Sequence, residues 1–407
     1  MNRHGIQACK YFVSATLLCS RNSGSPLAAD RVSPFKLLLM GTVSRVCIFF
    51  LALICNGALP SFASAQDPKV QISAEIERLQ HSLRATSVSD PDFSSLGSEI
   101  GRLLKEAADA LNSGKPYLSL EKLLQAEDFL QGLRVVEEKS AAVKSGLPAF
   151  EAEWESASKY LTVLNQESRQ RDWNGAPVAL QALSETAQGR SVPLLDGSRG
   201  FAASTKPKDG LFYMGQAQGN AVFGKLASAV SLTRNSLSFP LRSYLPELQK
   251  LQQKTNAAFK PPRSIELHTR FIALNSTLKL AEELDAQKFY AGALYQYLEA
   301  TRHFAMLDAP PLDAAQQSAW KADLATARKN LASSKQDDSL AQLFLERAES
   351  QTVHGDGSAP SADEWRSARV ILDQVLPAYF AARKPASPLQ QASGRTVNLT
   401  LVRWPYT

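Results

Sequence analysis

Apolar side chains recur at spacings of three and four residues along almost every segment from Ile72 to Phe380. This spacing matches the period of an α-helix, about 3.6 residues per turn, so it predicts helices rather than strands. The intervening residues are mainly Ala, Glu, Gln and Lys, which favour helix formation. The pattern therefore predicts an all-α fold. One apolar stripe that illustrates it consists of Leu96, Ile100, Leu103, Leu104, Ala107 and Leu111.

A break between two such stripes predicts a helical hairpin. Gly114 suits the residue that follows a helix C-terminus, because glycine adopts a positive φ without strain. Pro116 suits the first turn of the next helix, where its missing N–H group is not needed. We therefore expect two antiparallel helices joined at residues 112–116. The second stripe consists of Leu120, Leu123, Leu124 and Leu130.

The same period predicts further helices, which proline, glycine and serine residues separate. Ser361 and Glu364 are expected to form a capping box at the start of the last helix, because their spacing suits its first turn. The expected helical ranges are 147–173, 178–187, 211–232, 241–259, 265–284, 289–307, 316–332, 340–353 and 362–382.

Residues 189–210 are rich in Gly, Pro and Ser, a composition that is typical of a loop or linker. This segment predicts a boundary between an N-terminal helical domain over 66–188 and a C-terminal helical domain over 211–384. A tail over 385–407 follows the second domain.

The tail contains the strongest strand signal of the chain. Residues 396–406 (TVNLTLVRWPY) are β-branched and aromatic and alternate in polarity, which predicts a short β-strand. A lone strand has unpaired edges, so it would pair within the chain, with another copy or with a partner. The alternative interpretation is a tail that folds back on the helices with Trp404 as an apolar plug. Both interpretations stay open.

A second hairpin is expected near Leu284, and it repeats part of the first. An internal duplication is therefore predicted. Leu111, Lys115 and Tyr117 recur as Leu284, Lys288 and Tyr290. After a one-residue gap, residues 119–126 (SLEKLLQA) align with residues 293–300 (ALYQYLEA).

The second hairpin resembles the tetratricopeptide repeat (TPR) family. Tyr290, Ala293, Tyr297 and Ala300 reproduce the spacing of that family's inter-helix turn and second helix. The resemblance covers roughly 60 residues, without the family's regular period of about 34 residues or its closing proline. It implies a TPR-like protein-binding scaffold. The expected interaction face consists of Tyr117, Tyr290, Tyr295 and Tyr297.

Residues 40–65 have the layout of a secretory signal peptide. Arg45 supplies the positive charge, residues 46–55 form an unbroken apolar run, and Ala63 and Ala65 frame the cleavage site. This run is about half of the ~20 residues that a membrane-spanning helix needs, so no permanent membrane anchor is expected. The pattern predicts an exported protein with a mature N-terminus at Gln66.

Removal of this predicted leader, the signal peptide with the residues before it, changes the composition of the chain that remains. Residues 1–39 have no periodic pattern and are interpreted as a misassigned start or an unstructured extension. All four cysteines precede residue 66, so the mature chain has neither a disulfide nor a thiolate metal site. An exported protein without cysteine fits a bacterial periplasm or exterior better than eukaryotic secretion.

The charge balance excludes one class of partner. The whole chain carries +6, but the part after residue 65 has 39 basic and 38 acidic residues, a net charge of +1. No basic stripe with interleaved aromatic residues is present in the sequence, so nucleic acid is not an expected partner.

Residues 219–225 have the spacing of a phosphate-binding P-loop, but Leu226 stands where a hydroxyl group must bind magnesium. A structural interpretation fits better: Gly215, Gly219 and Gly224 would let a neighbouring helix approach closely. The aromatic and Met side chains at 212–214 fit either the core or the wall of a pocket.

The remaining polar motifs do not predict catalysis. Glu299 and His303 lie at i and i+4, where they share one helix face, but the ligand spacing of a di-iron bundle is not present. The sequence contains neither HExxH nor G-x-S-x-G, so no catalytic residue and no metal or other cofactor is predicted.

Two functional hypotheses follow. The first is an exported, non-enzymatic protein-protein interaction module or scaffold with an unidentified protein partner. The alternative is a helical bundle that binds a small ligand or a metal, centred on the Gly-rich helix and on the face of Glu299 and His303. The oligomeric state does not follow from the sequence.

Overall fold

The computed structural model describes residues 67–86, 91–204, 206–230, 232, 240–354 and 357–384. Every secondary-structure element in these ranges is helical, which confirms the predicted all-α class. The predicted leader, the segment 1–39 and the predicted strand at 396–406 lie outside the described residues. In the described ranges, no helix is both long and apolar enough to cross a membrane.

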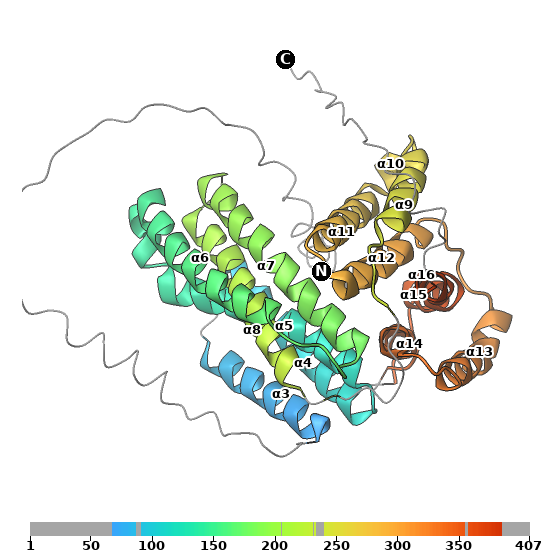
Figure 1. The fold of residues 1–407 in the computed structure, drawn as a ribbon. Helices are drawn as coiled ribbons and strands as arrows, with labels where there is room; N and C mark the ends of the chain where they lie inside the picture. Colours follow the sequence, from blue (N-terminus) through green and yellow to red (C-terminus); the bar gives the residue numbers. More distant parts are fainter. Residues whose placement is uncertain are drawn as a thin grey trace, which may run out of the picture.

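The helices fall into two groups that follow the chain order (Figure 1). The first half, residues 68–229, contains α3 (Pro68–Ala85), η2 (Pro91–Phe93), α4 (Ser94–Asn112), α5 (Pro116–Lys139), η3 (Ala142–Ser145), α6 (Leu147–Arg169), α7 (Val178–Ser204) and α8 (Pro207–Ala229). The second half, residues 245–382, contains α9 (Leu245–Ala258), α10 (Arg263–Glu266), α11 (His268–Ala286), α12 (Tyr290–Ala305), α13 (Ala314–Ala332), α14 (Ser339–Thr352), α15 (Ala362–Val370), the π-helix η4 (Ile371–Val375) and α16 (Leu376–Ala382).

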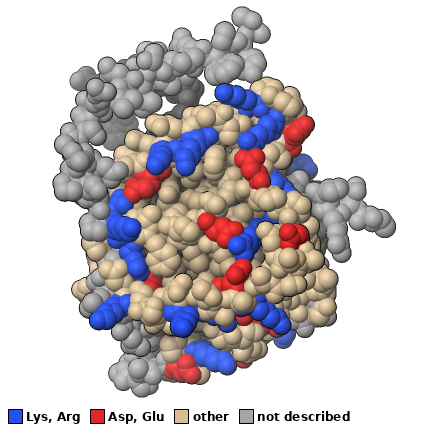
Figure 2. All heavy atoms as spheres, turned by 90° about the vertical axis from the view of Figure 1, so that its right-hand side faces the viewer, with Lys and Arg blue, Asp and Glu red and all other residues tan. Residues whose placement is uncertain are grey.

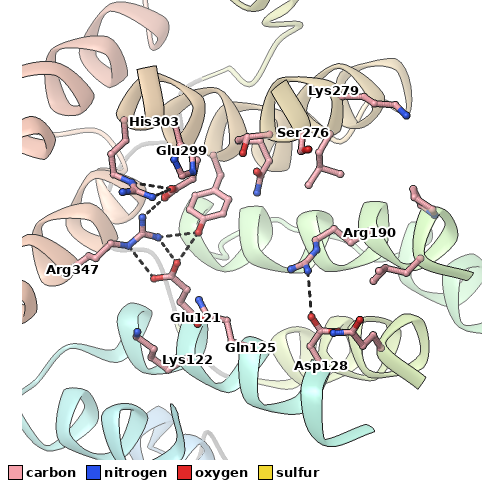
Figure 3. A pocket seen from close by; sticks show the side chains of 18 of the residues that line it. Glu121, Lys122, Gln125, Asp128, Arg190, Ser276, Lys279, Glu299, His303 and Arg347 are labelled. Atoms are coloured by element: carbon pink, nitrogen blue, oxygen red, sulfur yellow. Dashed lines mark hydrogen bonds and ion pairs between the residues drawn. The ribbon is translucent and has the colours of Figure 1, made fainter. Parts of the chain in front are cut away.

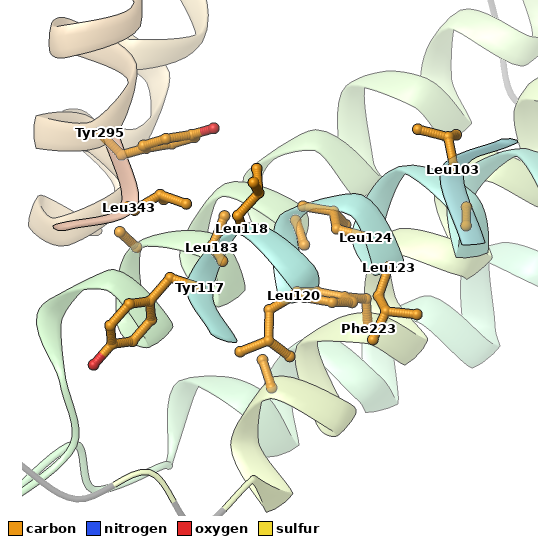
Figure 4. Packing of buried hydrophobic residues seen from close by; sticks show 14 of the residues in the cluster. Leu103, Tyr117, Leu118, Leu120, Leu123, Leu124, Leu183, Phe223, Tyr295 and Leu343 are labelled. Atoms are coloured by element: carbon orange, nitrogen blue, oxygen red, sulfur yellow. The ribbon is translucent and has the colours of Figure 1, made fainter. Parts of the chain in front are cut away.

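Most buried apolar residues belong to one core that continues from the first half into the second. Leu118 and Leu183 from the first half lie beside Tyr295 and Leu343 from the second half (Figure 4). A smaller cluster around Leu248 and Phe271 fills the space between α9 and α11. The continuous core explains why the two halves pack as one body.

The Gly-rich helix α8 packs directly against α5, as its sequence predicts. A Cβ atom on Gly219 would lie 2.8 Å from the carbonyl oxygen of Glu127, and one on Gly215 would lie 2.5 Å from that of Gln131. Only glycine leaves room for backbones this close. The P-loop-like residues lie inside this helix, where the backbone N–H groups bond along the helix and form no phosphate-binding loop.

Residues 189–204, predicted as a linker, form instead the second half of α7, so that prediction is wrong. Gly189 stays helical because it provides space for α11: a Cβ atom there would lie 2.3 Å from Leu284 Cδ2. Leu194 and Leu195 are buried in the core, which offsets the low helix propensity of the surrounding glycines. Tertiary packing therefore overrides the local composition.

Two pairs of sequential helices repeat the same turn. In α4–α5, Lys115 N–H donates to Ala110 C=O at 2.8 Å, and in α11–α12, Phe289 N–H donates to Leu284 C=O at 2.9 Å. Gly114 has a φ of 72° and Lys288 a φ of 64°, which places both in the left-handed region. The two turns therefore correspond at a constant offset of 174 residues, and the one-residue gap in the sequence alignment is not needed.

The second helix of each pair begins inside the molecule and is capped by a carboxylate from the other half. Leu118 N–H at the start of α5 donates to Glu346 of α14 at 2.8 Å. Gly292 N–H at the start of α12 donates to Glu185 of α7 at 2.8 Å. These bonds satisfy N–H groups that a helix N-terminus leaves without internal partners. We call Glu185 and Glu346 the crossed caps.

Each crossed cap is held by a glutamine one turn earlier on its own helix. Gln181 donates to Glu185 at 2.7 Å, and Gln342 donates to Glu346 at 3.0 Å. Both carboxylates are buried, with 5% of each residue exposed. The predicted capping box at Ser361 and Glu364 is also confirmed, since each residue bonds the other's backbone.

Replacing Gly219 with Ala should destabilise the protein by about 1–3 kcal/mol, the usual cost of overpacking. The added Cβ meets the α5 backbone, which cannot rotate away. Gly200→Ala on α7 is the matched control, because nothing lies within 4 Å of its Cβ position. That control should stabilise the protein by about 0.5–1 kcal/mol, because alanine favours the helix more than glycine does. Urea unfolding measures both, and equal effects of the two changes would disprove the close approach.

Glu346→Ala should lower the free energy of unfolding by about 1–3 kcal/mol, because it leaves a buried N–H group of α5 without an acceptor. Glu346→Gln keeps an oxygen at that place and should retain most of the stability. Urea titration at pH 7 compares the two variants. If the two variants lose the same free energy of unfolding, the hydrogen bond from Leu118 N–H does not contribute to stability as we describe.

Candidate functional site

A cleft of about 540 Å³ lies where the two halves meet. Its walls come from α5, α7 and α8 of the first half and from α11, α12 and α14 of the second. Ser276 and Lys279 lie on one wall, and Lys122 and Asp128 lie on the opposite wall (Figure 3). Small-molecule sites typically enclose about 300–1,000 Å³, so the cleft has a suitable size.

Arg347 of α14 closes one end of the cleft with a buried network. Its guanidinium group forms ion pairs with Glu121 of α5 and Glu299 of α12, and it donates to the hydroxyl of Tyr295 at 3.0 Å. That hydroxyl donates to Glu121 at 2.8 Å. Figure 3 shows the three helices contributing these side chains to one point. A buried guanidinium is stable only when it is paired in this way.

Glu299 is fixed as a carboxylate, and His303 beside it is neutral. Burial alone would raise the pKa of Glu299, but Arg347 and Arg302 lower it to about 2. Burial and the nearby positive charge of Arg302 lower the pKa of His303 to about 3. Both guanidinium groups already occupy the oxygens of Glu299. Of the pair predicted as a possible metal-binding face, Glu299 thus belongs to an ion-pair network and His303 lies beside it as a neutral ring.

A second polar group lies at the other end of the cleft. Arg190 of α7 donates to Asp128 of α5 at 3.3 Å, and Asn220 of α8 donates to the other oxygen of Asp128 at 3.0 Å. Burial raises the pKa of Asp128 to about 6, although Arg190 and Asn220 oppose the shift. Beside them, Gln216 of α8 is fully buried, and neither of its amide atoms has a hydrogen-bond partner within the described part of the chain.

The four tyrosines of the predicted interaction face do not form an exposed surface. Tyr295 is 6% exposed and Tyr117 is 9% exposed, and both belong to the main core. Tyr290 and Tyr297 are half-buried and pack against that core. The aromatic positions that resemble the repeat family therefore pack inward, and Tyr295 serves the cleft through its hydroxyl group.

Some cleft residues were not found by sequence reasoning. Arg347 binds Glu121 and Glu299, which lie 226 and 48 residues away along the chain. A pattern of neighbouring residues therefore cannot predict this contact. The one available signal is that Arg347 and Glu346 directly follow the largely apolar stretch Leu340–Leu345. Gln216 and Arg190 lie in segments that were interpreted as a packing helix and a linker.

The described residues contain no cluster of three or more His, Cys, Asp or Glu side chains that could hold a metal ion. Charged side chains of both signs are interspersed on the face drawn in Figure 2. A continuous patch of one sign, which would favour a polyanion or an acidic partner, does not occur on that face.

The chain matches no protein family, no curated protein and no solved structure.

The lowered pKa of His303 predicts how the stability of the protein depends on pH. Its folded pKa of about 3 lies below the ordinary value of 6.5, so between these values the unfolded chain binds a proton that the folded chain does not. This contribution is complete above pH 6.5 and is lost as the pH falls toward 3. His303→Gln should therefore lose less stability than the parent protein between pH 7 and pH 5.

Urea titrations at pH 7, 6 and 5 measure this difference in slope. His81→Gln, at an exposed position on α3, is the control and should follow the parent protein. Parallel curves for His303→Gln and the parent would contradict a depressed pKa at His303.

Proposed function

We propose that the protein is a non-enzymatic binding protein that holds a small polar ligand in the cleft between its two halves. The observation that carries the proposal is Gln216, a fully buried amide in the cleft wall with no partner within the described residues. An unsatisfied buried amide costs about 1–3 kcal/mol, and a ligand that bonds it would recover this free energy.

Glu121, Glu299 and His303 support binding rather than catalysis. Glu121 and Glu299 are both paired with Arg347, so neither carboxylate is placed to accept a proton from a substrate. His303 is neutral but has no carboxylate free to orient it as a base, since Arg302 and Arg347 occupy Glu299. Apolar Leu118, Phe129 and Leu194 complete the walls, as in typical ligand sites.

The scaffold hypothesis has less support, because the tyrosines that would form its interaction face are mostly inside the core. The finer architecture, an array of TPR-like antiparallel hairpins, stays a proposal that the two matching turns support. We also propose, from residues 40–65 alone, that the protein is exported to a bacterial periplasm or exterior.

Native mass spectrometry of the protein purified gently from its source cells tests the binding function. We expect a low-mass, non-covalent adduct on the parent protein. Gln125→Trp should abolish it, because Gln125 lines the cleft and the indole would fill the space. Glu155→Trp, at an exposed position on α6, is the control and should keep the adduct.

The absence of a low-mass adduct, or its retention in Gln125→Trp, would contradict the proposal. A protein that co-purifies with the parent in place of a small molecule would favour the scaffold hypothesis instead.

A further inference from the structure

Arg190 has hydrogen-bond donors that its one carboxylate partner does not use. Its guanidinium group carries five N–H donors. Among the described residues it has a single acceptor, Asp128 Oδ2, at a long distance of 3.3 Å. The side chain is 29% exposed and lines the cleft. The partly exposed guanidinium therefore offers a ligand in the cleft further donors, in a fork geometry that suits a carboxylate.

Asp128 is the one acidic side chain of the cleft lining that pairs with Arg190 among the described residues. Glu121 and Glu299 are bound by Arg347 at the opposite end, and their oxygens are shared with Tyr295 and Arg302. Lys122 and Lys279 line the same cleft, and Lys122 is paired with Glu106 at 2.7 Å. Lys279 has one distant partner, Glu283 at 3.7 Å, so its charge is only weakly compensated.

Each half also contributes one amide oxygen that lacks a donor among the described residues. Gln216 supplies it from α8, and Gln351 supplies it from α14, and both side chains line the cleft. A buried oxygen without a donor favours a ligand that carries hydroxyl or amide N–H groups. The cleft thus combines an anion-binding guanidinium with acceptors for neutral donors.

We propose, on the basis of the binding function above, that the ligand is a small carboxylate that also carries hydroxyl or amide groups. Its carboxylate is bound by Arg190, and its hydrogen-bond donors are accepted by Gln216 and Gln351. Sugar acids and N-acylated amino acids have this chemistry.

Isothermal titration calorimetry with matched probes tests the carboxylate requirement. The anionic probes are D-glucuronate and N-acetylglycine, and their neutral counterparts are D-glucose and N-acetylglycinamide. We expect at least one anionic probe to bind, and to bind about tenfold or more tightly than its neutral counterpart, because a charge-assisted bidentate contact is lost in the neutral one.

Three variants identify the role of Arg190. Arg190→Gln should weaken the anionic probe about tenfold, whereas Arg199→Gln, an exposed arginine on the same helix, should not. Asp128→Asn removes the carboxylate that competes for Arg190, so it should strengthen binding of the anionic probe. This variant keeps the test decisive if Arg190→Gln leaves Asp128 unpaired and unfolds the protein.

Equal affinity for charged and neutral probes, unchanged affinity in both Arg190→Gln and Asp128→Asn, or no binding of either anionic probe would overturn the inference. The proposed function would still stand if native mass spectrometry found a cleft-dependent adduct without a carboxylate. It would fall together with the inference only if no small molecule occupied the cleft.

Discussion

The fold depends on how the buried starts of α5 and α12 are capped. A helix N-terminus presents N–H groups that its own turns cannot satisfy, and inside a core they cannot turn to water. The crossed caps solve this reciprocally, since Glu346 of the second half serves α5 and Glu185 of the first half serves α12. Neither half can move away without leaving both N–H groups, and one oxygen of each buried carboxylate, without their partners. The walls of the cleft therefore keep a fixed separation.

The same helix that supplies one crossed cap supplies the charge network of the cleft. Glu346 and Arg347 are neighbours on α14, so their side chains leave the helix about 100° apart. One side chain reaches the start of α5, and the other reaches Glu121 and Glu299. Such a buried ion network stabilises the fold only when it is complete, because removing one member leaves the others charged and buried without a partner. Stability and the shape of the cleft thus depend on one turn of one helix.

The sequence predicted the helices well because their apolar stripes are local signals, and the close approach at Gly215 and Gly219 followed from the same kind of pattern. It failed where distant contacts decide the outcome. Residues 189–204 look like a linker, yet Gly189 is helical because Leu284 fills the space beside it. The crossed caps join residues 107 and 228 positions apart, so no window along the chain reveals them. The cleft was missed for this reason. Its residues Glu299, His303 and Tyr295 were singled out from the sequence, but for a possible metal-binding face and a protein-interaction face.

The position of the cleft is related to the two matching turns. Glu121 and Tyr295 occupy equivalent places after these turns in α5 and α12, at the offset of 174 residues, and they bond directly to each other. The residues that follow the two crossed caps differ, because Glu346 is followed by Arg347 in α14 and Glu185 is followed by Thr186 in α7. Only the arginine can pair with both Glu121 and Glu299. The charge network at one end of the cleft therefore depends on a residue that the matching segment of the first half does not have.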